Sequence, residues 1–506
     1  MTSQKTTPGR DVQGAPTSVV GSFSFAFSSG RRLRIEVLGG LVVALALIPE
    51  SIAFSVLAGV DPRIGLFASV IMAIVISFTG GRPAMISAAT GAVAVVIAPV
   101  AREYGVEYFI ATVLLAGVFQ IALSLLGVAK LMRFIPRSVM IGFMNSLAII
   151  VFSAQIPHLI GVPWLVYPVF ALGLLIMVGF PRLTTSIPAP LVTIVILTSV
   201  TLAFGLNIPT VSDQGELPDS LPQLFIPDVP LTIETFAIIA PFALAMAFVG
   251  LMESLLTAKL VDDITDNHSD KSREAWGQGV ANIVTGFFGG MGGCAMIGQT
   301  LINVRESKAR TRLSTFLAGF FLLILILALG DIVGMIPMAA LVAVMVVVAV
   351  MSFDWRSVSP KTLRLMPISE SAVMIITVAA TLLTHNLAIG VAVGVLSAMV
   401  MFARRVARVV DIEKVPADGN PRSVTYRVDG QLFFASSNDL VYAFDYTEDV
   451  DSVLIDLSTA RIWDASTVAA LDSIIQKFGD RGVSVEIIGL DGPSQERLDK
   501  LSGKLG

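Results

Sequence analysis

One stretch decides how this chain folds: Ile48-Pro49-Glu50-Ser51-Ile52. It lies inside an apolar segment, roughly residues 36–58, and about 20 apolar residues are enough to cross a bilayer. A carboxylate within such a segment costs at least about 2.5 kcal/mol on insertion scales, so it normally serves a transport pathway or a charge pair. Pro49 also breaks the backbone ladder next to the acid. The stretch therefore predicts a membrane helix that carries a functional acid.

The composition indicates a membrane protein with a separate water-soluble domain. Hydrophobic residues make up 55% of the chain, the mean hydropathy is +0.82 and charged residues are 14%, whereas soluble domains carry about 25% charged residues. Residues 1–410 hold 46 of these charges and residues 411–506 hold 26. We therefore expect a transmembrane domain over 31–410 and a cytoplasmic domain over 411–506. Residues 1–30, rich in Ser, Thr, Gly and Pro, are expected to form a flexible cytoplasmic tail.

The same composition argues against several functions. A net charge of −4 gives no basic surface for nucleic acid. The single cysteine, Cys294, excludes an intramolecular disulfide and a thiolate metal site, and the three histidines are far apart. No nucleophile arrangement, metal-ligand set or phosphate-binding loop is recognisable. We expect neither an enzyme nor a cofactor.

Hydropathy predicts about fourteen membrane spans, each needing roughly 20 residues or a shorter interrupted helix. The full-length candidates are roughly 36–58, 107–128, 137–157, 164–180, 188–205, 235–258, 313–330, 336–353, 367–384 and 386–403, and shorter ones lie near 64–79, 84–100, 274–291 and 295–303. Positive side chains favour the cytoplasmic side of a membrane. Because arginines precede the first span and follow the last, both termini are expected in the cytoplasm, which requires an even number of crossings. These arginines are Arg31, Arg32 and Arg34 at the start and Arg404, Arg405 and Arg408 at the end.

Three local matches indicate an internal repeat over about 31–205 and 232–410. They recur in the same order at offsets of 203, 211 and 201 residues. The pairs are Ile48-Pro49-Glu50-Ser51-Ile52 with Leu251-Met252-Glu253-Ser254-Leu255, Ala84-Met85-Ile86-Ser87 with Ala295-Met296-Ile297-Gly298, and Phe134-Ile135-Pro136 with Met335-Ile336-Pro337. Seven spans per repeat is an odd number, so the copies must be inverted, as in many secondary transporters whose substrate binds near the midplane.

The short third and tenth spans are the expected interrupted pair of this plan. Their helices would begin near Ser87 and near Gly298 and would meet at the midplane from opposite faces. Helix N-termini carry unpaired N–H groups and a partial positive charge, so anions bind there without a basic side chain. The glycines before these helices suit irregular backbone that lines a cavity. The alternative is that they only permit close helix packing.

Several motifs resemble the sulfate-permease (SulP) family of anion transporters. They are Gly39-Gly40 through Leu57-Ala58-Gly59-Val60-Asp61-Pro62, Ile135-Pro136-Arg137-Ser138-Val139-Met140-Ile141-Gly142-Phe143, Asn282-Ile283-Val284-Thr285-Gly286-Phe287-Phe288-Gly289-Gly290 and Ile336-Pro337-Met338-Ala339-Ala340-Leu341. The resemblance implies an all-α membrane domain of fourteen helices in two inverted seven-helix repeats, divided into core and gate domains, in a bacterial inner-membrane homodimer. It also implies an anionic substrate and coupling to protons or sodium.

The C-terminal part resembles the STAS domain of that family, most clearly at Gly430-Gln431-Leu432-Phe433-Phe434. Strands are predicted over 423–434, Ser452–Leu457 and Val483–Gly489, with helices over Ser466–Phe478 and Pro493–Leu501, which makes a small α/β domain. In related anti-sigma-factor antagonists a serine after an Asp is phosphorylated, and Ser466 takes that position. A role as helix N-cap is the simpler interpretation of Ser466.

Two intramembrane acids, Glu50 and Glu253, stand at equivalent positions of the repeats. In the family the first of these positions is commonly Gln, and the second is Glu or Asp and supports ion coupling in sodium-linked members, together with a Thr that corresponds to Thr257. The alternative is a structural role in bonding exposed backbone. We predict Glu253, Thr257 and Glu50 as coupling-ion residues.

The sequence departs from the family at the start of the tenth helix. Many relatives carry Arg within a triplet that here is Gly298-Gln299-Thr300. Two ionised acids and an anion without a cation would repel strongly at low dielectric. Burial and a like charge favour the neutral form of a carboxyl group, so uptake of a proton with the anion is the simplest solution. Sodium at Glu253 and Thr257 is the second. The predicted substrate-binding residues are Glu50, Ser87, Ala88, Gly298, Gln299 and Thr300.

The sequence thus favours a proton-coupled secondary transporter of small anions. C4-dicarboxylates such as fumarate are favoured as cargo, because protonated carboxyl groups and the amide of Gln299 can donate hydrogen bonds to a carboxylate. Sodium-coupled bicarbonate or proton-coupled sulfate transport remain alternatives, as does an anion channel. A membrane-anchored sensor that signals through the C-terminal domain is a third class.

Overall fold

The computed structural model describes residues 16–127, 135–183, 188–218, 220–384, 386–407, 411–416 and 422–504. The chain forms two compact units, Met1–Gly394 and Val395–Gly506. The division falls inside helix α16 (Leu387–Ala407). The apolar segments of the sequence belong almost entirely to the first unit, and the charged C-terminal part belongs to the second.

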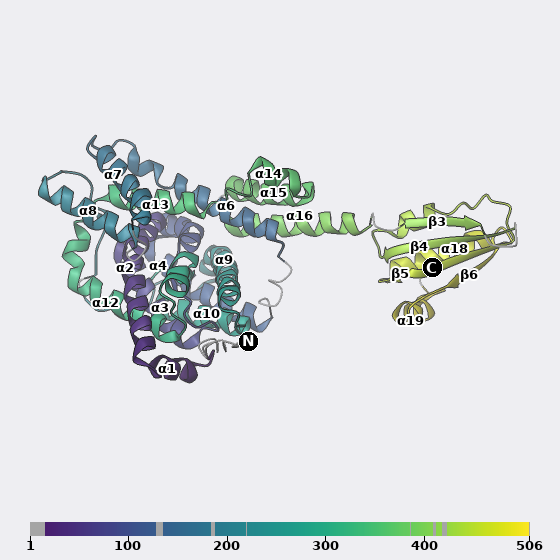
Figure 1. Ribbon diagram of the computed structural model, residues 1–506, viewed down its shortest axis with the longest axis horizontal. Coiled ribbons are helices and arrows are strands. Elements are labelled where there is room, and N and C mark those ends of the chain that lie inside the picture. Colours follow the sequence, from purple (N-terminus) through teal and green to yellow (C-terminus); the bar gives the residue numbers. More distant parts are fainter. Residues whose placement is uncertain are drawn as a thin grey trace, which may run out of the picture. The chain divides into compact units, whose positions relative to one another are not determined.

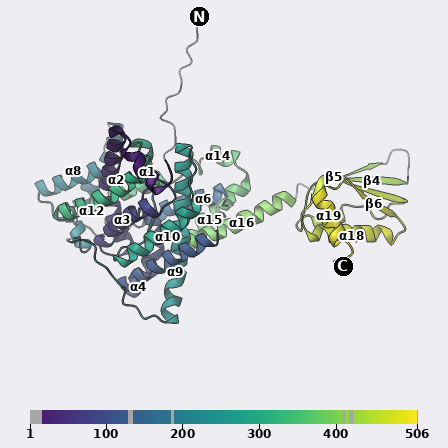
Figure 2. The ribbon, with the colours of Figure 1, turned by 90° about the horizontal axis from the view of Figure 1, so that it is seen from below.

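The first unit is built of apolar helices (Figures 1 and 2). Their bounds are α2 Gly30–Ala58, α3 Pro62–Thr79, α4 Gly91–Leu125, α6 Arg137–Ser153, α7 Val166–Gly179, α8 Ala189–Ala203, α9 Ile233–Thr265, α10 Lys271–Phe287, α11 Ile297–Leu301, α12 Arg312–Gly334, α13 Met338–Ser352, α15 Ile368–Thr384 and α16. Among the described residues, seven helices are long and apolar enough to cross a membrane, and four shorter apolar helices accompany them. Gly105, with φ 86° and ψ 179°, divides α4 into two helical segments. With α4 counted as two and α11 with the π-helix η6 (Ile302–Glu306) as one, the helices given above make fourteen segments of the described chain in the predicted order.

The helices of the first unit contact each other in two groups. One group contains α2, α3, α4, α9, α10 and α12, and the other contains α6, α7, α8, α13 and α15. Small residues allow the close approach within the first group: a Cβ on Gly117 of α4 would lie 2.7 Å from the carbonyl oxygen of Gly279 on α10. Interfaces of this kind are typical of membrane helices, where water does not drive association.

The structure supports two of the three repeat matches in detail. Helices α2 and α9 start 203 residues apart, at Gly30 and Ile233, which gives Glu50 and Glu253 equivalent positions. Pro136 and Pro337 are both N-caps, of α6 and α13. The remaining match, residues 84–87 with residues 295–298, is out of register. The strands β1 (Ser87–Ala89) and β2 (Gly293–Ala295) start 206 residues apart rather than 211. The apolar composition of these segments produced the false alignment.

The N-terminal segment differs from the expected flexible tail where the structure describes it. Residues 1–15 lie outside the described residues, but Val19–Phe27 form helix α1, capped by the Ser18 hydroxyl. The Ser22 hydroxyl is buried and accepts a hydrogen bond from the Arg312 backbone N–H at 3.0 Å. Polar composition suggested flexibility, but this segment has a specific partner at the start of α12.

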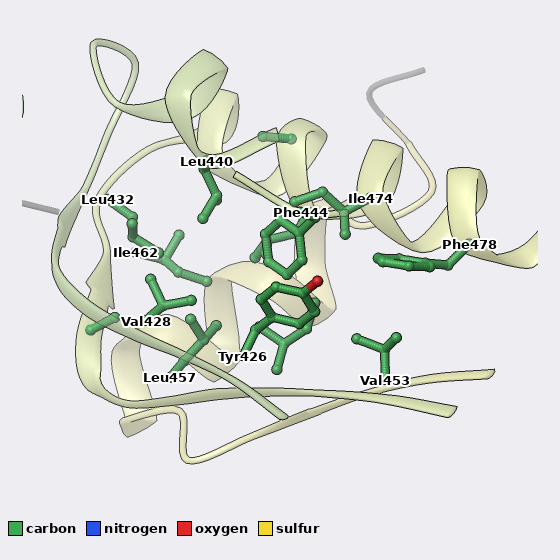
Figure 3. Close-up of a cluster of buried hydrophobic side chains, with 14 of the residues drawn as sticks. Tyr426, Val428, Leu432, Leu440, Phe444, Val453, Leu457, Ile462, Ile474 and Phe478 are labelled. Carbon is green, nitrogen blue, oxygen red and sulfur yellow. The ribbon is translucent and has the colours of Figure 1, made fainter. Parts of the chain in front are cut away.

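The second unit is an α/β domain around one mixed sheet of order β3-β4-β5-β6. The strands are β3 Asp411–Pro416, β4 Ser423–Leu432, β5 Ser452–Ile462 and β6 Ser484–Ile488, and the helices are α17 Ser437–Tyr442, α18 Ala465–Gly479 and α19 Gly492–Leu501. Only the β3–β4 pair is antiparallel, so α18 is the crossover between parallel strands. Inward-facing side chains of the sheet pack with those of the helices: Tyr426 of β4 lies against Phe444, which follows α17, and Phe444 lies against Phe478 of α18 (Figure 3). The N-cap of α18 is Asp464, whose carboxylate accepts from the Thr467 N–H, so the interpretation of Ser466 as N-cap was wrong by two residues.

Candidate functional site

Two short strands cross at the centre of the first unit. Strands β1 and β2 pair antiparallel, with Ala88 opposite Cys294, and all six residues are buried. Antiparallel pairing of two equivalent strands is what a twofold axis in the membrane plane produces. Each strand leads into an interrupted helix: α4 starts at Gly91 after the N-cap Thr90, and α11 starts at Ile297 after the N-cap Met296. The two helix N-termini therefore lie on either side of the crossing.

Glycine is required where the two backbones meet. A Cβ on Gly293 would lie 2.1 Å from the carbonyl oxygen of Ala88, which no real side chain tolerates. The buried Asn282 of α10 holds the same glycine from the other side. Its side-chain amide donates to the Gly293 carbonyl at 3.1 Å, and its carbonyl oxygen accepts from the Gly293 N–H at 2.9 Å. Residues of a family motif thus fix the position of β2.

Glu50 and Gln299 form the first polar pair at the crossing. Glu50 is buried on α2 directly after Pro49, and the Gln299 side chain lies next to its carboxylate. Gln299 is the third residue of α11 and is also buried. An acid from the first repeat therefore lies beside the start of the interrupted helix of the second repeat.

Glu253 is the centre of the second polar group. It is half-buried on α9, and the Cys294 thiol donates to its Oε2 at 2.9 Å. The Cys294 sulfur lies 3.1 Å from the Thr90 hydroxyl oxygen, and either atom can donate. Thr257, one turn after Glu253, donates to the Glu253 carbonyl at 2.8 Å and lies 3.4 Å from the Ala295 carbonyl. The Glu253 carboxylate, the Thr257 hydroxyl and the nearby carbonyl oxygens are the atoms that a sodium ion would use in this group.

The other predicted site residues have different surroundings. The Ser87 hydroxyl accepts from the Gln278 side chain at 2.6 Å, and the Thr300 hydroxyl accepts from the Ile86 N–H at 3.0 Å. Ala88 contributes backbone to the strand pair. Gly298, in contrast, is exposed, and a Cβ there would meet nothing within 4 Å. The start of α11 is thus open at Gly298, whereas Ser87 and Thr300 bond within the protein.

Sequence reasoning missed three polar residues of this region. Thr90 caps α4 by accepting from the Val93 N–H at 3.4 Å, and a Thr followed by a helical run is a recognisable capping signal. Nothing in the sequence indicated that Cys294 contacts Glu253 and Thr90, because these contacts depend on the pairing of β1 with β2. Gln278 gave no signal, because nothing in the sequence relates α10 to β1.

The buried arginines of the described residues are bonded away from both acids. Arg82 lies 3.3 Å from Asp262, and Arg312 donates to the carbonyl oxygen of Ser77 at 3.1 Å. In the part of the chain that the structure describes, no ion pair involves Glu50 or Glu253, and no group of three or more His, Cys, Asp or Glu forms a metal site. The partners of the two acids are an amide and a thiol.

Comparison with known proteins agrees with this architecture. The profile of the Sulfate permease family matches residues 33–166 and 163–379, and that of the STAS domain matches residues 414–502. The protein named "Putative sulfate transporter YbaR" of Bacillus subtilis (strain 168) is 50% identical over 470 residues, which cover 93% of this chain and 97% of that protein. "Bicarbonate transporter BicA" of a Picosynechococcus species is 27% identical over 531 residues, covering 93% and 91%.

Solved structures show the same fold. The transmembrane domain of a cyanobacterial bicarbonate transporter BicA has a TM-score of 0.61 at 25% identity, covering 73% of this chain and 98% of that one. The murine anion transporter Slc26a9 in its inward-facing state has a TM-score of 0.82 at 17% identity, covering 96% and 90%. The predicted fold class, a multi-pass helical membrane domain followed by a STAS domain, is confirmed. With its family profile over most of its length and a relative that shares half of its residues, the chain belongs to the sulfate permease family of membrane transporters and is not an enzyme.

Proposed function

We propose that this transporter is a proton-coupled symporter of small anions, with C4-dicarboxylates such as fumarate as its favoured cargo. The observation that carries the proposal is the position of Glu50 beside Gln299 at the start of α11, where a Cβ on Gly298 would meet no atom within 4 Å. An acid at an anion site without a neighbouring cation has to be neutralised when the anion binds, because like charges repel strongly at low dielectric.

The anion is held chiefly by backbone donors in this proposal. The first N–H groups of a helix have no partner inside the helix, and the helix dipole adds a partial positive charge at that end. Two such ends face the crossing of β1 and β2, at Gly91 and at Ile297. Gly298 supports the proposal, because its missing side chain leaves the α11 backbone accessible to a ligand.

The Glu50–Gln299 pair links the proton to the anion. While Glu50 is ionised, the Gln299 amide group faces it, so that at least one of the two amide N–H groups is directed to Glu50 and not to a substrate. Once Glu50 is protonated, its O–H donates to the amide carbonyl of Gln299 and the NH₂ group turns to the anion. One proton thus removes a negative charge and adds a donor, so proton and anion bind best together.

The choice of cargo follows from the donors. Amide and protonated carboxyl groups bond well to the carboxylates of a dicarboxylate, and Glu50 and Gln299 supply both types beside the backbone N–H groups. Sulfate is the second candidate, since the name of the 50% identical relative designates a sulfate transporter. Bicarbonate with sodium at Glu253 and Thr257 is the third, since a more distant relative is named a bicarbonate transporter.

We further propose that the protein is a homodimer in the bacterial inner membrane with both termini in the cytoplasm. The arginines at the start of α2 and those near the end of α16 support this orientation, since positive residues are retained on the cytoplasmic side. Cysteine-accessibility labelling of single-cysteine variants at the exposed residues 18 and 466 would test it in intact cells.

The test of function is uptake by the purified full-length protein in liposomes. Radiolabelled fumarate, sulfate and bicarbonate are supplied with an inward proton gradient, a sodium gradient or neither. We expect saturable fumarate uptake that accelerates several-fold as the external pH falls from about 7.5 to about 5.5, the direction in which carboxyl groups become neutral. Uptake that ignores pH but rises steeply with sodium would refute proton coupling and reassign Glu253 and Thr257 as a sodium site. Linear, non-saturating flux would identify a channel instead.

A further inference from the structure

Cys294 connects two groups that belong to different repeats. Its thiol donates to Glu253 of α9 at 2.9 Å, and its sulfur contacts the Thr90 hydroxyl, the N-cap of α4, at 3.1 Å. Thr90 in turn accepts from the Val93 N–H. Cys294 is fully buried, as is Ala88 opposite it, so neither contact competes with bulk water. An acid of the second repeat is thereby joined to the helix start of the first repeat.

The hydrogen bonds from Glu253 through Cys294 to Thr90 can point in either direction, because a thiol and a hydroxyl each donate once and also accept. With Glu253 ionised, Thr90 O–H donates to sulfur and the S–H donates to the carboxylate. With Glu253 protonated, its O–H donates to sulfur and the S–H turns to the Thr90 oxygen, which still accepts from Val93. Within each state every hydrogen stays bonded to its own oxygen or sulfur atom, and the two states differ in the rotation of the S–H and O–H groups. In the second state the Thr90 hydroxyl hydrogen is released at the N-terminus of α4.

We propose that Cys294 is a positioning residue that transmits the ionisation state of Glu253 to Thr90, so that protonation of Glu253 gives the anion a further donor at the start of α4. The inference rests on the proton-coupled anion transport proposed above and assigns Cys294 and Thr90 to its coupling machinery. It also explains how Glu253 acts on the anion although its carboxylate bonds to the thiol and not to a helix N-terminus.

Three charged groups on the helices that pack against α9 bond to residues other than Glu253. Helix α9 packs against α4, α10, β2 and α11. On α10, Glu274 accepts from the Gly81 N–H at 2.7 Å and Lys271 bonds to Asp262 at 2.6 Å. On α4, Arg102 donates to the Leu57 carbonyl at 3.4 Å. In the described part of these elements, Cys294 is the titratable side chain that bonds to Glu253.

The experiment is a double-mutant cycle on anion binding to the full-length protein in detergent. Cys294→Ala removes the link, Cys294→Ser keeps a donor and an acceptor at the same place, and Thr90→Val removes the hydroxyl at nearly constant volume. Thr112→Val is the matched control, since its buried hydroxyl in α4 bonds only to its own helix. Equilibrium binding of radiolabelled fumarate, with sulfate as second probe, is measured from about pH 7.5 to about pH 5.5.

We expect wild-type affinity to rise about tenfold over this range, as one charge-assisted hydrogen bond provides. Cys294→Ala and Thr90→Val should each reduce the rise to about twofold or less, and the double variant should lose no more than either single one. Cys294→Ser and Thr112→Val should retain the wild-type profile. An unchanged pH profile in Cys294→Ala, or single effects that multiply in the double variant, would overturn the inference. If Cys294→Ala does not fold, an unchanged profile in Thr90→Val has the same consequence.

Failure of the proposed function would be recognisable separately. Wild-type uptake that follows sodium and ignores protons refutes proton symport, and the binding cycle then still decides whether the two residues act together. If the losses of pH response in Cys294→Ala and Thr90→Val do not multiply in the double variant, the inferred link between the two residues stands. If they multiply, the link is refuted. Proton-driven uptake with an unaltered pH profile in Cys294→Ala would leave the function standing and refute the role of the thiol.

Discussion

The two repeats have equivalent backbones at the crossing but different side chains. In the first, Glu50 lies directly beside Gln299 of α11, whereas in the second, Glu253 reaches Thr90 of α4 only through Cys294. The difference follows from the position that corresponds to Gln299 in the first repeat, 206 residues earlier, which is Val93 and cannot donate to an acid. The comparison teaches that the fold is symmetric while the chemistry is not. We therefore expect the two acids to contribute unequally to transport.

The equivalence of the two backbones is tested most severely at Gly293, where β1 and β2 meet. Gly293→Ala would put a methyl group 2.1 Å from the Ala88 carbonyl oxygen. Since β1 and β2 cannot separate without disturbing both interrupted helices, we expect a loss of at least about 3 kcal/mol and no measurable transport. Thermal unfolding of the purified protein and its yield of monodisperse material are the measurements.

Gly298→Ala is the matched control for that substitution, because a Cβ there meets no atom within 4 Å. It should fold like the wild type. If both alanine variants unfold at the same temperature as the wild type, the close approach of the two strands is not the constraint described above.

The side-chain part of the comparison is tested by making both acids permanently neutral. Glu253→Gln should lower uptake driven by a proton gradient about 100-fold, the range typical of a lost proton-transfer group, while anion exchange persists. Glu50→Gln should lower it only about tenfold, because an amide at that position can still bond to Gln299. Gradient-driven uptake and counterflow in liposomes separate the two effects. Equal losses, or a larger loss in Glu50→Gln, would remove the asymmetry between the repeats.

Sequence reasoning identified the helices and the two acids but not their partners. Glu50 and Glu253 are evident because a charge within an apolar run is rare, and Pro136 and Pro337 are evident because they recur at the same place in a repeat match. The contact between Cys294 and Thr90 joins residues 204 positions apart, and no local pattern encodes it. The predicted alignment of the β1 segment with the β2 segment was wrong for a related reason. Both segments are made of small apolar residues, so several alignments score alike, and only the glycine at position 293 fits the crossing.

The smallest expected effect comes from adding the cation that the first pair lacks. Gln299→Arg would bring a guanidinium group next to the buried Glu50 and neutralise it without a proton. Anion affinity should then still rise about fivefold between about pH 7.5 and about pH 5.5, against about tenfold in the wild type, because Glu253 with its thiol still responds to pH. Gln299→Met, which removes the amide without adding charge, is the control and should weaken binding at every pH. Equilibrium binding of radiolabelled fumarate measures both variants. If Gln299→Arg keeps the full pH response of the wild type, then Glu50 does not take part in proton coupling, and Glu253 with its thiol carries the coupling alone.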